Sequence, residues 1–459
     1  MTPESAVANG DVSWWWHDLG GLPSARPALT GDLDADVAIV GAGYTGLWAA
    51  YYLKTRQPDL RVAVLEQRFA GFGASGRNGG WLTNSVTGGR ARYGRDGGAA
   101  QQLALNAAVE EVIAVTEREG IHADIVNGGE FEVARTPAAL ARLRTTFAEE
   151  AAWPGTDVEL LDAAAAASRI DIAGALGGIW HPHCARVHPA KLASGLASAV
   201  ERLGVTIYEN THVSAIEAGR AITDHGIVRA AHVLRATEGF TADLRGEHRT
   251  WLPMNSSMIV TEQLPPSFWS NVGWEGRETL GDFAHVYMYA QRTADDRIAF
   301  GGRGVPYRYG SRVDTDGSTQ ERTITSLAAL LRDFFPDASA VPIAHAWAGV
   351  LGVPRDWAAT VGLDRATGLG WAGGYVGTGV TATNLAGRTL ADLVLERETD
   401  LVRLPWVDHR AKNWEVEPLR FLAVNAIYTA YRAADRAEAS GRSSRTSVFA
   451  KAADLIAGR

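Results

Sequence analysis

The clearest hydrophobic pattern lies near the N-terminus, where an apolar run is followed by a helical repeat and then by a second apolar run. Residues 36–40 read DVAIV, which is typical of a parallel strand buried on both faces. A helical pattern runs from Leu47 to about Arg56, and residues 61–65 read RVAVL, a second strand. The pattern predicts a complete βαβ unit.

The later patterns indicate a second region with a different construction. Residues 97–174 are rich in alanine and acidic residues, and we expect them to be mostly helical. From 251 to 305, apolar and polar positions alternate, which predicts an antiparallel sheet with one covered face. Residues 205–208 and 231–236 are interpreted as further strands of the first sheet. An amphipathic helix at 420–435 belongs to a C-terminal appendage.

Composition narrows the class of protein. Of the 459 residues, 46% are apolar and 21% charged, which is ordinary for a globular chain of two or three domains and excludes a long disordered protein. The net charge of -8, without a basic stripe, argues against nucleic-acid binding. The one cysteine excludes an intramolecular disulfide and indicates a reducing compartment, so we expect a cytoplasmic protein.

Two local clusters, the tryptophans at 14–16 and the histidines and cysteine at 181–188, could suggest a membrane contact and a metal site. For each we expect the simpler alternative. The adjacent residues Trp14, Trp15 and Trp16 are expected to pack on the protein's own surface, with docking at a membrane interface as the alternative. Because there is no stretch of 18 or more apolar residues, we expect no membrane-spanning helix. The histidines and the cysteine at 181–188 lie too close together for a tetrahedral zinc site, so we expect no metal.

A glycine-rich turn joins the first predicted strand to the first predicted helix. Residues 41–46 read GAGYTG, in which Gly41 permits a tight turn, Gly43 lets the backbone approach a pyrophosphate and Gly46 lets the helix pack on the strand. Glu66 follows Gly46 by 20 residues, which is the usual distance between this glycine motif and an acidic residue that binds the ribose hydroxyls. A carboxylate at this position would repel a 2′-phosphate, so NADP is disfavoured. The sequence predicts a dinucleotide site, but this motif alone does not separate FAD from NAD.

Residues beyond this motif carry a family resemblance. Residues 73–80 read GASGRNGG, a run that has no role in a simple NAD domain. With this segment the chain resembles the FAD-dependent D-amino-acid oxidase-like (DAO) superfamily, most closely its γ-glutamylputrescine oxidoreductase-like branch. The motifs HPAKL at 188–192 and GYVGTGV at 374–380 are similar to those of the branch, although Thr378 replaces a histidine common there. The resemblance covers roughly residues 34–398.

The resemblance implies an α/β fold, with a FAD-binding Rossmann-like domain and a second, antiparallel-sheet substrate domain, as in glycine oxidase and D-amino-acid oxidase. The expected division is an N-terminal extension at 1–33, a FAD-binding domain at 34–96, 175–245 and 341–398, a substrate domain at 97–174 and 246–340, and a C-terminal helical appendage at 399–459.

The resemblance also implies a non-covalent FAD, held by the glycine-rich segments and by the ends of the predicted strands. The residues expected to bind it are Gly41, Gly43, Tyr44, Thr45, Gly46, Glu66, Gln67, Arg68, Gly73, Ala74, Ser75, Arg77, Asn78, Gly79, Gly80, Val213, Thr237, Gly239, Gly374, Gly377, Thr378 and Gly379. At Glu238 and Gly239 the chain departs from the branch's pattern.

In this superfamily a C–H beside nitrogen passes a hydride to flavin N5, and the imine is then hydrolysed. The resemblance therefore implies that no side chain is needed as a catalyst, because the flavin carries the chemistry. Candidate residues of the substrate pocket are His285, Tyr287, Tyr289, Trp347 and Thr378. The first three are expected to share one strand face with Gln291, with ordinary sheet packing as the alternative, and Trp347 is expected mainly to pack near the flavin.

The substrate is inferred from two departures. Amino-acid oxidases of the family clamp the substrate carboxylate with arginines, and the matching positions here hold Leu351 and Gly377. This favours a small aliphatic primary or secondary amine as substrate, unless Arg292 or Arg303 supplies a clamp from the sheet.

Several alternatives stay open. The second interpretation is an oxidase or dehydrogenase of an amino acid or an N-methyl amino acid. A third, of another class, is an interaction protein with a structural FAD, whose contact surfaces would be segment 420–435 and the tryptophan-rich start. Beyond the amine, the expected partner is oxygen or another electron acceptor, with no nucleic acid and no membrane. The oligomeric state is left open.

Overall fold

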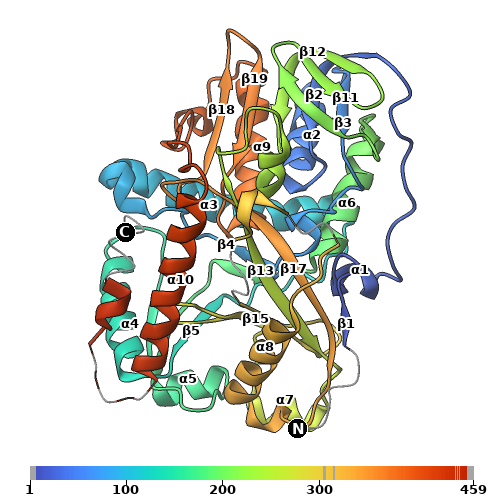
Figure 1. Cartoon of the computed structure of the whole chain (residues 1–459). Coiled ribbons are helices and arrows are strands. Elements are labelled where there is room, and N and C mark those ends of the chain that lie inside the picture. Colours follow the sequence, from blue (N-terminus) through green and yellow to red (C-terminus); the bar gives the residue numbers. More distant parts are fainter. Residues whose placement is uncertain are drawn as a thin grey trace.

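The protein is described by a computed structural model that covers residues 7–302, 307–313, 316–439, 441, 443 and 445–451. Two large β-sheets organise it: an eight-stranded sheet in the upper half of Figure 1 and a nine-stranded sheet in the lower half. The mixed α/β architecture confirms the predicted fold class.

The eight-stranded sheet contains the predicted βαβ unit. Strand β2 pairs in parallel with β3 on one side and with β12 on the other, and helix α2 connects β2 to β3. The sheet runs in the order β10-β11-β12-β2-β3-β9, and β19 also pairs with β12 and with β18. Its strands are β2 (Leu33–Val40), β3 (Val62–Leu65), β9 (Thr206–Tyr208), β10 (Val213–Glu217), β11 (Arg220–Thr223), β12 (Ile227–Arg235), β18 (Thr360–Asp364) and β19 (Leu369–Gly373).

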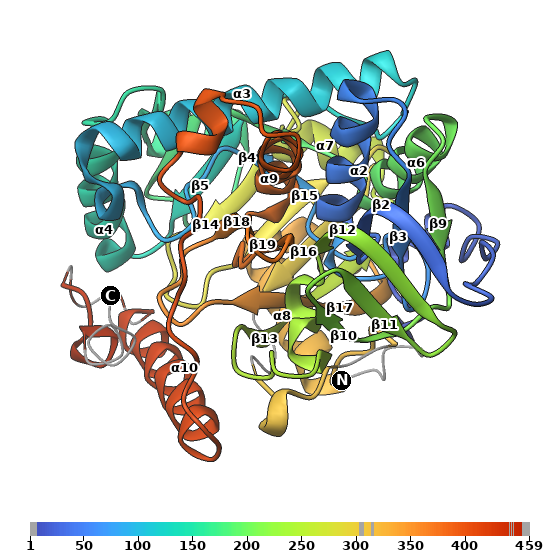
Figure 2. The same cartoon turned by 90° about the horizontal axis from the view of Figure 1, so that it is seen from above.

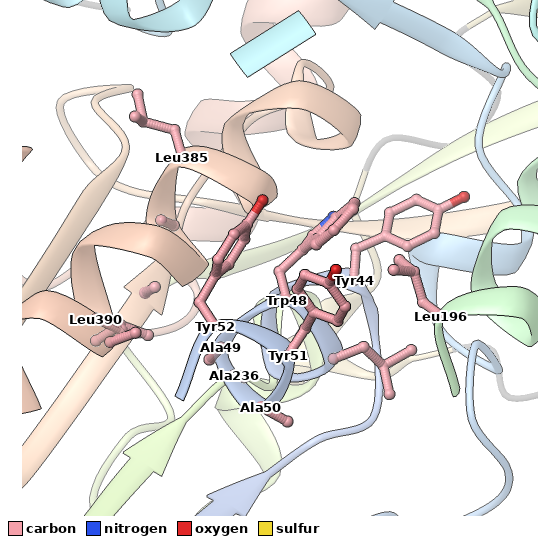
Figure 3. Close-up of a cluster of buried hydrophobic side chains, with 14 of the residues drawn as sticks. Tyr44, Trp48, Ala49, Ala50, Tyr51, Tyr52, Leu196, Ala236, Leu385 and Leu390 are labelled. Atoms are coloured by element: carbon pink, nitrogen blue, oxygen red, sulfur yellow. The ribbon is translucent and has the colours of Figure 1, made fainter. Parts of the chain in front are cut away.

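Four helices build the core beside this sheet: α2 (Tyr44–Arg56), α3 (Gly94–Arg118), α6 (Pro189–Arg202) and α9 (Gly379–Val394). Helix α2 is buried along most of its length. Two of its side chains, Trp48 and Tyr52, stack on each other with ring centroids 5.8 Å apart. Figure 3 shows the rings of Trp48 and Tyr52 next to each other, with Leu385 and Leu390 of α9 on the side of Tyr52. A Cβ at Gly387 of α9 would lie 2.5 Å from the Cβ of Trp48, so the close packing of the two helices depends on that glycine.

The nine-stranded sheet runs in the order β1-β17-β13-β16-β15-β14-β5-β7-β6. Its strands are β1 (Ala8–Asn9), β5 (Glu130–Ala134), β6 (Glu159–Asp162), β7 (Gly177–His181), β13 (Leu252–Thr261), β14 (Thr279–Asp282), β15 (Tyr289–Arg292), β16 (Ile298–Gly302) and β17 (Ile343–Val353). Helices α7 (Pro266–Val272) and α8 (Glu321–Phe334) pack on it, and α4 (Pro137–Glu150) and α5 (Ala163–Arg169) lie beside β5, β6 and β7.

The structure differs from the sequence-based expectation in three places. Strands β5 and β6 interrupt the range 97–174, which was expected to be mostly helical, because strands of four or five residues give little signal between longer helices. Strands β7 and β17 belong to the nine-stranded sheet although their residues fall in the ranges assigned to the FAD-binding domain, since β7 pairs with β5 and β17 with β13. We move these two strands to the second region, and the remaining division stays a prediction.

The first described strand and the helix α10 both contact the second sheet. Strand β1 pairs with β17, and helix α1 (Trp14–Asp18) buries all three adjacent tryptophans, at 5%, 1% and 2% exposure, so the interpretation as packing is correct. Helix α10 (Leu419–Glu438) stands near α4 in Figure 1 and projects at one corner of the molecule in Figure 2. Within the described residues, no helix is both long and apolar enough to cross a bilayer.

Candidate functional site

The glycine turn between β2 and α2 has the geometry that the sequence predicts. Gly41 has φ +105°, and a Cβ there would lie 2.5 Å from the carbonyl oxygen of Ala236. A Cβ at Gly46 would lie 2.0 Å from the carbonyl oxygen of Gly41, so any larger residue would separate the helix from the turn. Gly43 is the N-cap of α2, whose first N–H groups and positive dipole end face a pocket.

That pocket, called here the dinucleotide pocket, lies where the carboxyl ends of β2 and β3 meet, at Val40 and Leu65. In an open α/β sheet this is the edge at which nucleotides bind. The predicted cofactor residues that line it are Gly41, Gly43, Tyr44, Thr45, Glu66, Gln67, Arg68, Gly73, Ala74, Ser75, Asn78, Val213, Thr237, Gly377 and Gly379. Segments far apart in the sequence therefore converge on one pocket.

Glu66 ends β3 with its carboxylate turned toward the glycine turn. Its Oε2 accepts from the backbone N–H of Ala42 at 2.9 Å, and its Oε1 accepts from that of Arg68 at 2.9 Å. Burial raises the pKa of Glu66, while these backbone hydrogen bonds lower it. The remaining acceptor capacity faces the pocket, as a group that binds ribose hydroxyls requires.

Seven predicted cofactor residues do not line this pocket. They are Gly46, Arg77, Gly79, Gly80, Gly239, Gly374 and Thr378. Several of the glycines support it instead, because a Cβ at Gly80 would meet Gln291 Nε2 at 2.0 Å and a Cβ at Gly239 would meet Val350 at 2.7 Å. Arg77 is 2% exposed and donates through Nε to the carbonyl of Phe72, so it fastens the glycine-rich segment rather than facing the nucleotide space.

Sequence reasoning missed the role of Glu238, which it noted only as a departure from a motif. Its Oε1 accepts from Gly352 N at 3.0 Å and its Oε2 from Gly374 N at 2.9 Å, so one carboxylate ties β17 to the loop before α9. Glu238 lines the dinucleotide pocket and has φ +43°, a strained value for this residue type. Burial raises its pKa to about 7, against the backbone hydrogen bonds.

This pKa makes stability depend on pH with a definite sign. Since the folded-state value of about 7 exceeds the ordinary 4.5, the stabilisation from proton binding is complete below the ordinary value and is lost as pH rises through the folded value. We expect the melting temperature to fall more in the wild type than in Glu238→Gln between about pH 5 and about pH 8. Thermal unfolding at both pH values measures this, with Glu149→Gln on the exposed face of α4 as control. Equal falls in the wild type and Glu238→Gln would contradict the assignment.

A second space, the inner cavity, adjoins the dinucleotide pocket and has a volume of about 460 Å³. Ala74, Asn78, Leu351, Gly377 and Val380 line both spaces, so the two meet at these residues. A Cβ at Gly377 would meet no heavy atom within 4 Å, so the junction is open there.

Four of the five predicted pocket residues, His285, Tyr287, Tyr289 and Thr378, line the inner cavity. Trp347 does not, which corrects that prediction. It is fully buried, donates from Nε1 to the carbonyl of Arg77 at 2.9 Å and packs edge-on against Trp15.

The predicted strand face that would join His285 to Tyr289 is also wrong. Strand β15 begins only at Tyr289, and His285 lies in the turn before it. The appendage holds this turn, because Asp435 of α10 accepts from His285 N at 2.8 Å, Glu438 contacts His285 Nε2 at 3.0 Å and the ring of Tyr431 stacks on the imidazole. The predicted C-terminal appendage thus shapes the cavity wall.

The inner cavity also contains three carboxylates that the sequence analysis did not identify: Glu130, Glu132 and Asp282. Glu130 and Glu132 alternate with Phe131 and Val133 on β5, which are fully buried in the apolar core. The alternation therefore places both acidic side chains on the opposite, cavity-facing side. This alternation over the five residues of β5 was the signal from which the two acidic cavity residues could have been predicted.

The two positions at which amino-acid oxidases of the family carry a carboxylate-binding arginine lie at the junction of the dinucleotide pocket and the inner cavity. Here they are Leu351 and Gly377. Arg292, the proposed substitute, does not line the cavity, since its guanidinium lies over Trp269 and pairs with Asp296 at 2.9 Å. Arg303 falls outside the described residues. Arg142 does line the cavity, but it pairs with Glu438 at 2.6 Å and donates to the carbonyl of Phe283 at 2.6 Å.

A wider outer basin of about 1300 Å³ borders the inner cavity and shares His285, Tyr287, Val376, Thr378 and Tyr431 with it. The histidines and the cysteine of 181–188 contribute to none of these three spaces. Cys184 Sγ is buried and contacts Thr279 Oγ1 at 3.2 Å, so it offers no point of attachment for a cofactor in the dinucleotide pocket.

The residues present fit FAD. The turn at Gly41, Gly43 and Gly46 leaves the start of α2 clear of side chains for a pyrophosphate, and Glu66 stands where a ribose would lie. The open backbone at Gly377 then leads from the nucleotide end toward the inner cavity.

Comparison with known proteins agrees with this geometry. A family described as "DAO: FAD dependent oxidoreductase" matches residues 36–393. The γ-glutamylputrescine oxidoreductase of Escherichia coli is 31% identical over 376 residues, which cover 80% of this chain and 85% of that protein. A probable oxidoreductase, OrdL, of Rhizobium meliloti is 29% identical over 87% of this chain and 92% of its own. The crystal structure of glycine oxidase from Geobacillus kaustophilus superposes with a TM-score of 0.68 at 22% identity, covering 82% of this chain and 99% of that one.

Proposed function

We propose, from the premise that this chain belongs to the DAO family of FAD-dependent oxidoreductases, that it oxidises the C–N bond of a small aliphatic primary or secondary amine. Membership of this family makes the chain an enzyme that uses FAD, and it sets aside a purely structural role for the cofactor.

The chemistry divides between the cofactor and the chain. Bound FAD would accept a hydride from the carbon beside the nitrogen and pass the two electrons on to oxygen. The substrate nitrogen loses a proton in the same oxidation, and water then converts the imine to a carbonyl compound, with release of ammonia from a primary amine or of a smaller amine from a secondary amine. The residues that line the junction near Gly377 hold the substrate there.

The preference for amines rests on one observation: Leu351 and Gly377, not arginines, stand at the junction of the dinucleotide pocket and the inner cavity. Neither can bind a carboxylate on the reacting carbon, whereas an arginine could do so through two hydrogen bonds. The nearby Arg142 is paired with Glu438, and the three acidic residues of the cavity wall offer no positive charge to a substrate carboxylate.

The test is a substrate panel with the purified, flavin-loaded enzyme. We expect anaerobic bleaching of the flavin absorbance by aliphatic amines, with kcat/KM at least about tenfold higher than for glycine or N-methylglycine, which corresponds to about 1.4 kcal/mol. In air, peroxide should form in equal amount to the carbonyl product. Faster bleaching by amino acids would support the second interpretation, an amino-acid oxidase, and an absence of bleaching with every compound would refute amine oxidation.

The peroxide measurement also distinguishes the electron acceptors. If the amine bleaches the flavin but peroxide does not appear in air, an acceptor other than oxygen takes the electrons. The proposed oxidation of the amine would then stand and the oxygen step would be replaced.

A further inference from the structure

We propose that the inner cavity selects amines that carry a second cationic nitrogen, and that Glu132, supported by Asp282 and Glu130, binds this distal charge. This inference rests on the proposed function, because it names the class of amine that the same site accepts. Diamines and polyamines have the required chemistry, with one nitrogen at the junction near Gly377 and another at the acidic wall.

The first support is the placement of the carboxylates on neighbouring strands. In the parallel pairing of β5 with β14, Glu132 lies opposite Gly281 and next to Asp282. A Cβ at Gly281 would lie 3.3 Å from Glu132 Cγ and 3.3 Å from Trp81 Cη2, so the side chain of Glu132 crosses the glycine and lies beside the indole. The sheet thus directs the acid into the cavity.

The second support is that the three acids differ in how they are bonded. Glu130 Oε2 accepts from Thr83 Oγ1 at 2.7 Å and faces His181 Nε2 at 3.5 Å. Asp282 Oδ1 accepts from Met288 N at 2.9 Å. The carboxylate of Glu132, unlike its backbone in the sheet, makes no hydrogen bond or ion pair in the part of the chain that the structure describes. An acid in a cavity wall with no bonding partner from the protein is suited to a partner from the ligand.

The ionisation of these groups agrees with that arrangement. Burial raises the pKa of Glu132 well above its usual range, and the charges of Glu130 and Asp282 raise it further. Burial likewise raises the pKa of Asp282 to about 7. A bound ammonium group would lower the pKa of these carboxyl groups again, because an opposite charge at close range favours the ionised form.

The opposing charges in the wall are already engaged. Arg142 pairs with Glu438 of α10, and Arg77 donates to the carbonyl oxygens of Phe72 and Ala348 beneath the glycine-rich segment. Neither guanidinium is paired with Glu132 in the described residues. The acidic wall is therefore not neutralised by the arginines that border the same cavity.

Aromatic rings complete the site. Trp81 and Tyr289 both line the cavity and meet edge to face, with ring centroids 6.3 Å apart. Each ring is held in place, since Trp81 Nε1 donates to the carbonyl of Ala290 at 3.2 Å and Tyr289 Oη lies 2.8 Å from Ser256 Oγ. Aromatic faces next to carboxylates stabilise ammonium groups and also pack against the methylenes that link two nitrogens.

The test compares α,ω-diamines and spermidine with n-alkyl monoamines of equal chain length and with ω-amino acids, at low ionic strength. For the wild-type enzyme we expect kcat/KM at least about tenfold higher for the best diamine than for its matched monoamine, with the difference mainly in KM. In Glu132→Gln this ratio should fall toward one. Asp282→Asn, which can keep the bond from Met288 N, should lower the ratio less.

The matched control is Glu149→Gln on the exposed face of α4, which removes the same charge outside the cavity and should leave the ratio unchanged. Flavin content and melting temperature of each variant report folding. The wild-type comparison of diamine with monoamine tests the inference even if Glu132→Gln does not fold.

Equal kcat/KM for diamines and monoamines, or a higher value for ω-amino acids, would overturn this inference while leaving amine oxidation intact. Failure of every amine to bleach the flavin would instead refute the proposed function, so the two outcomes are distinct.

Discussion

Replacement of Gly43 by aspartate is expected to yield a folded protein that purifies without FAD, with affinity for the cofactor reduced at least about a hundredfold, or about 2.7 kcal/mol. The added Cβ would lie 3.0 Å from Ser75 Oγ, and the carboxylate would stand at the start of α2 in the dinucleotide pocket. There it would occupy the anion site and repel a pyrophosphate. Aspartate is a favourable N-cap residue, so the helix itself should be maintained.

The measurement is the ratio of flavin absorbance to protein absorbance after purification, followed by titration of the apoprotein with FAD. Gly31→Asp is the matched control, because it adds the same charge where a Cβ would meet no heavy atom within 4 Å. Full flavin content in Gly43→Asp would show that the cofactor does not bind at the start of α2.

The second large effect is expected for Trp15→Ala. Trp15 is 1% exposed, donates from Nε1 to the carbonyl of Asn78 at 2.9 Å and packs edge to face on His188 and Trp347. Truncation of a buried tryptophan costs about 3–5 kcal/mol of unfolding free energy. Because Asn78 lines both the dinucleotide pocket and the inner cavity, the variant should also lose FAD more readily than the wild type.

Chemical denaturation with and without added FAD measures both effects. Leu22→Ala in the same segment serves as the control, since Leu22 is 54% exposed and its truncation should change stability little. Trp15→Phe should give an intermediate loss, because it keeps most of the packing and removes the hydrogen bond to Asn78. If Trp15→Ala were as stable as Leu22→Ala, the N-terminal segment would not support the cofactor site.

The parts of this structure that the sequence predicts well are those with local causes. The glycines at 41–46 are required by contacts within one strand, one turn and one helix, and the buried run DVAIV leaves no amphipathic alternative. The burial of Trp14–Trp16 was likewise accessible from composition, since such rings are seldom left in water.

The parts that were missed depend on contacts between distant segments. The acidic wall arises because β5 and β14, about 150 residues apart, pair in parallel, and a five-residue alternation carries too little signal to predict that pairing. His285 was assigned to a strand face because its neighbours alternate, but α10 holds it in a turn through Asp435 and Glu438. The sequence showed Glu238 only as a departure from the branch's motif. Its structural role could not be predicted because its hydrogen-bond partners, Gly352 and Gly374, are more than 100 residues away.

The pairing of β1 with β17 has a consequence for how the protein is made. Ala8 lies opposite His345, so β1 can pair with β17 only after more than 300 further residues have been synthesised. At synthesis rates of about 5–20 residues per second, this interval lasts roughly 20–70 s. Until β17 is synthesised, Trp15 lacks the ring of Trp347 as a packing partner, so this wall of the cofactor site is completed much later than the glycine turn that it supports.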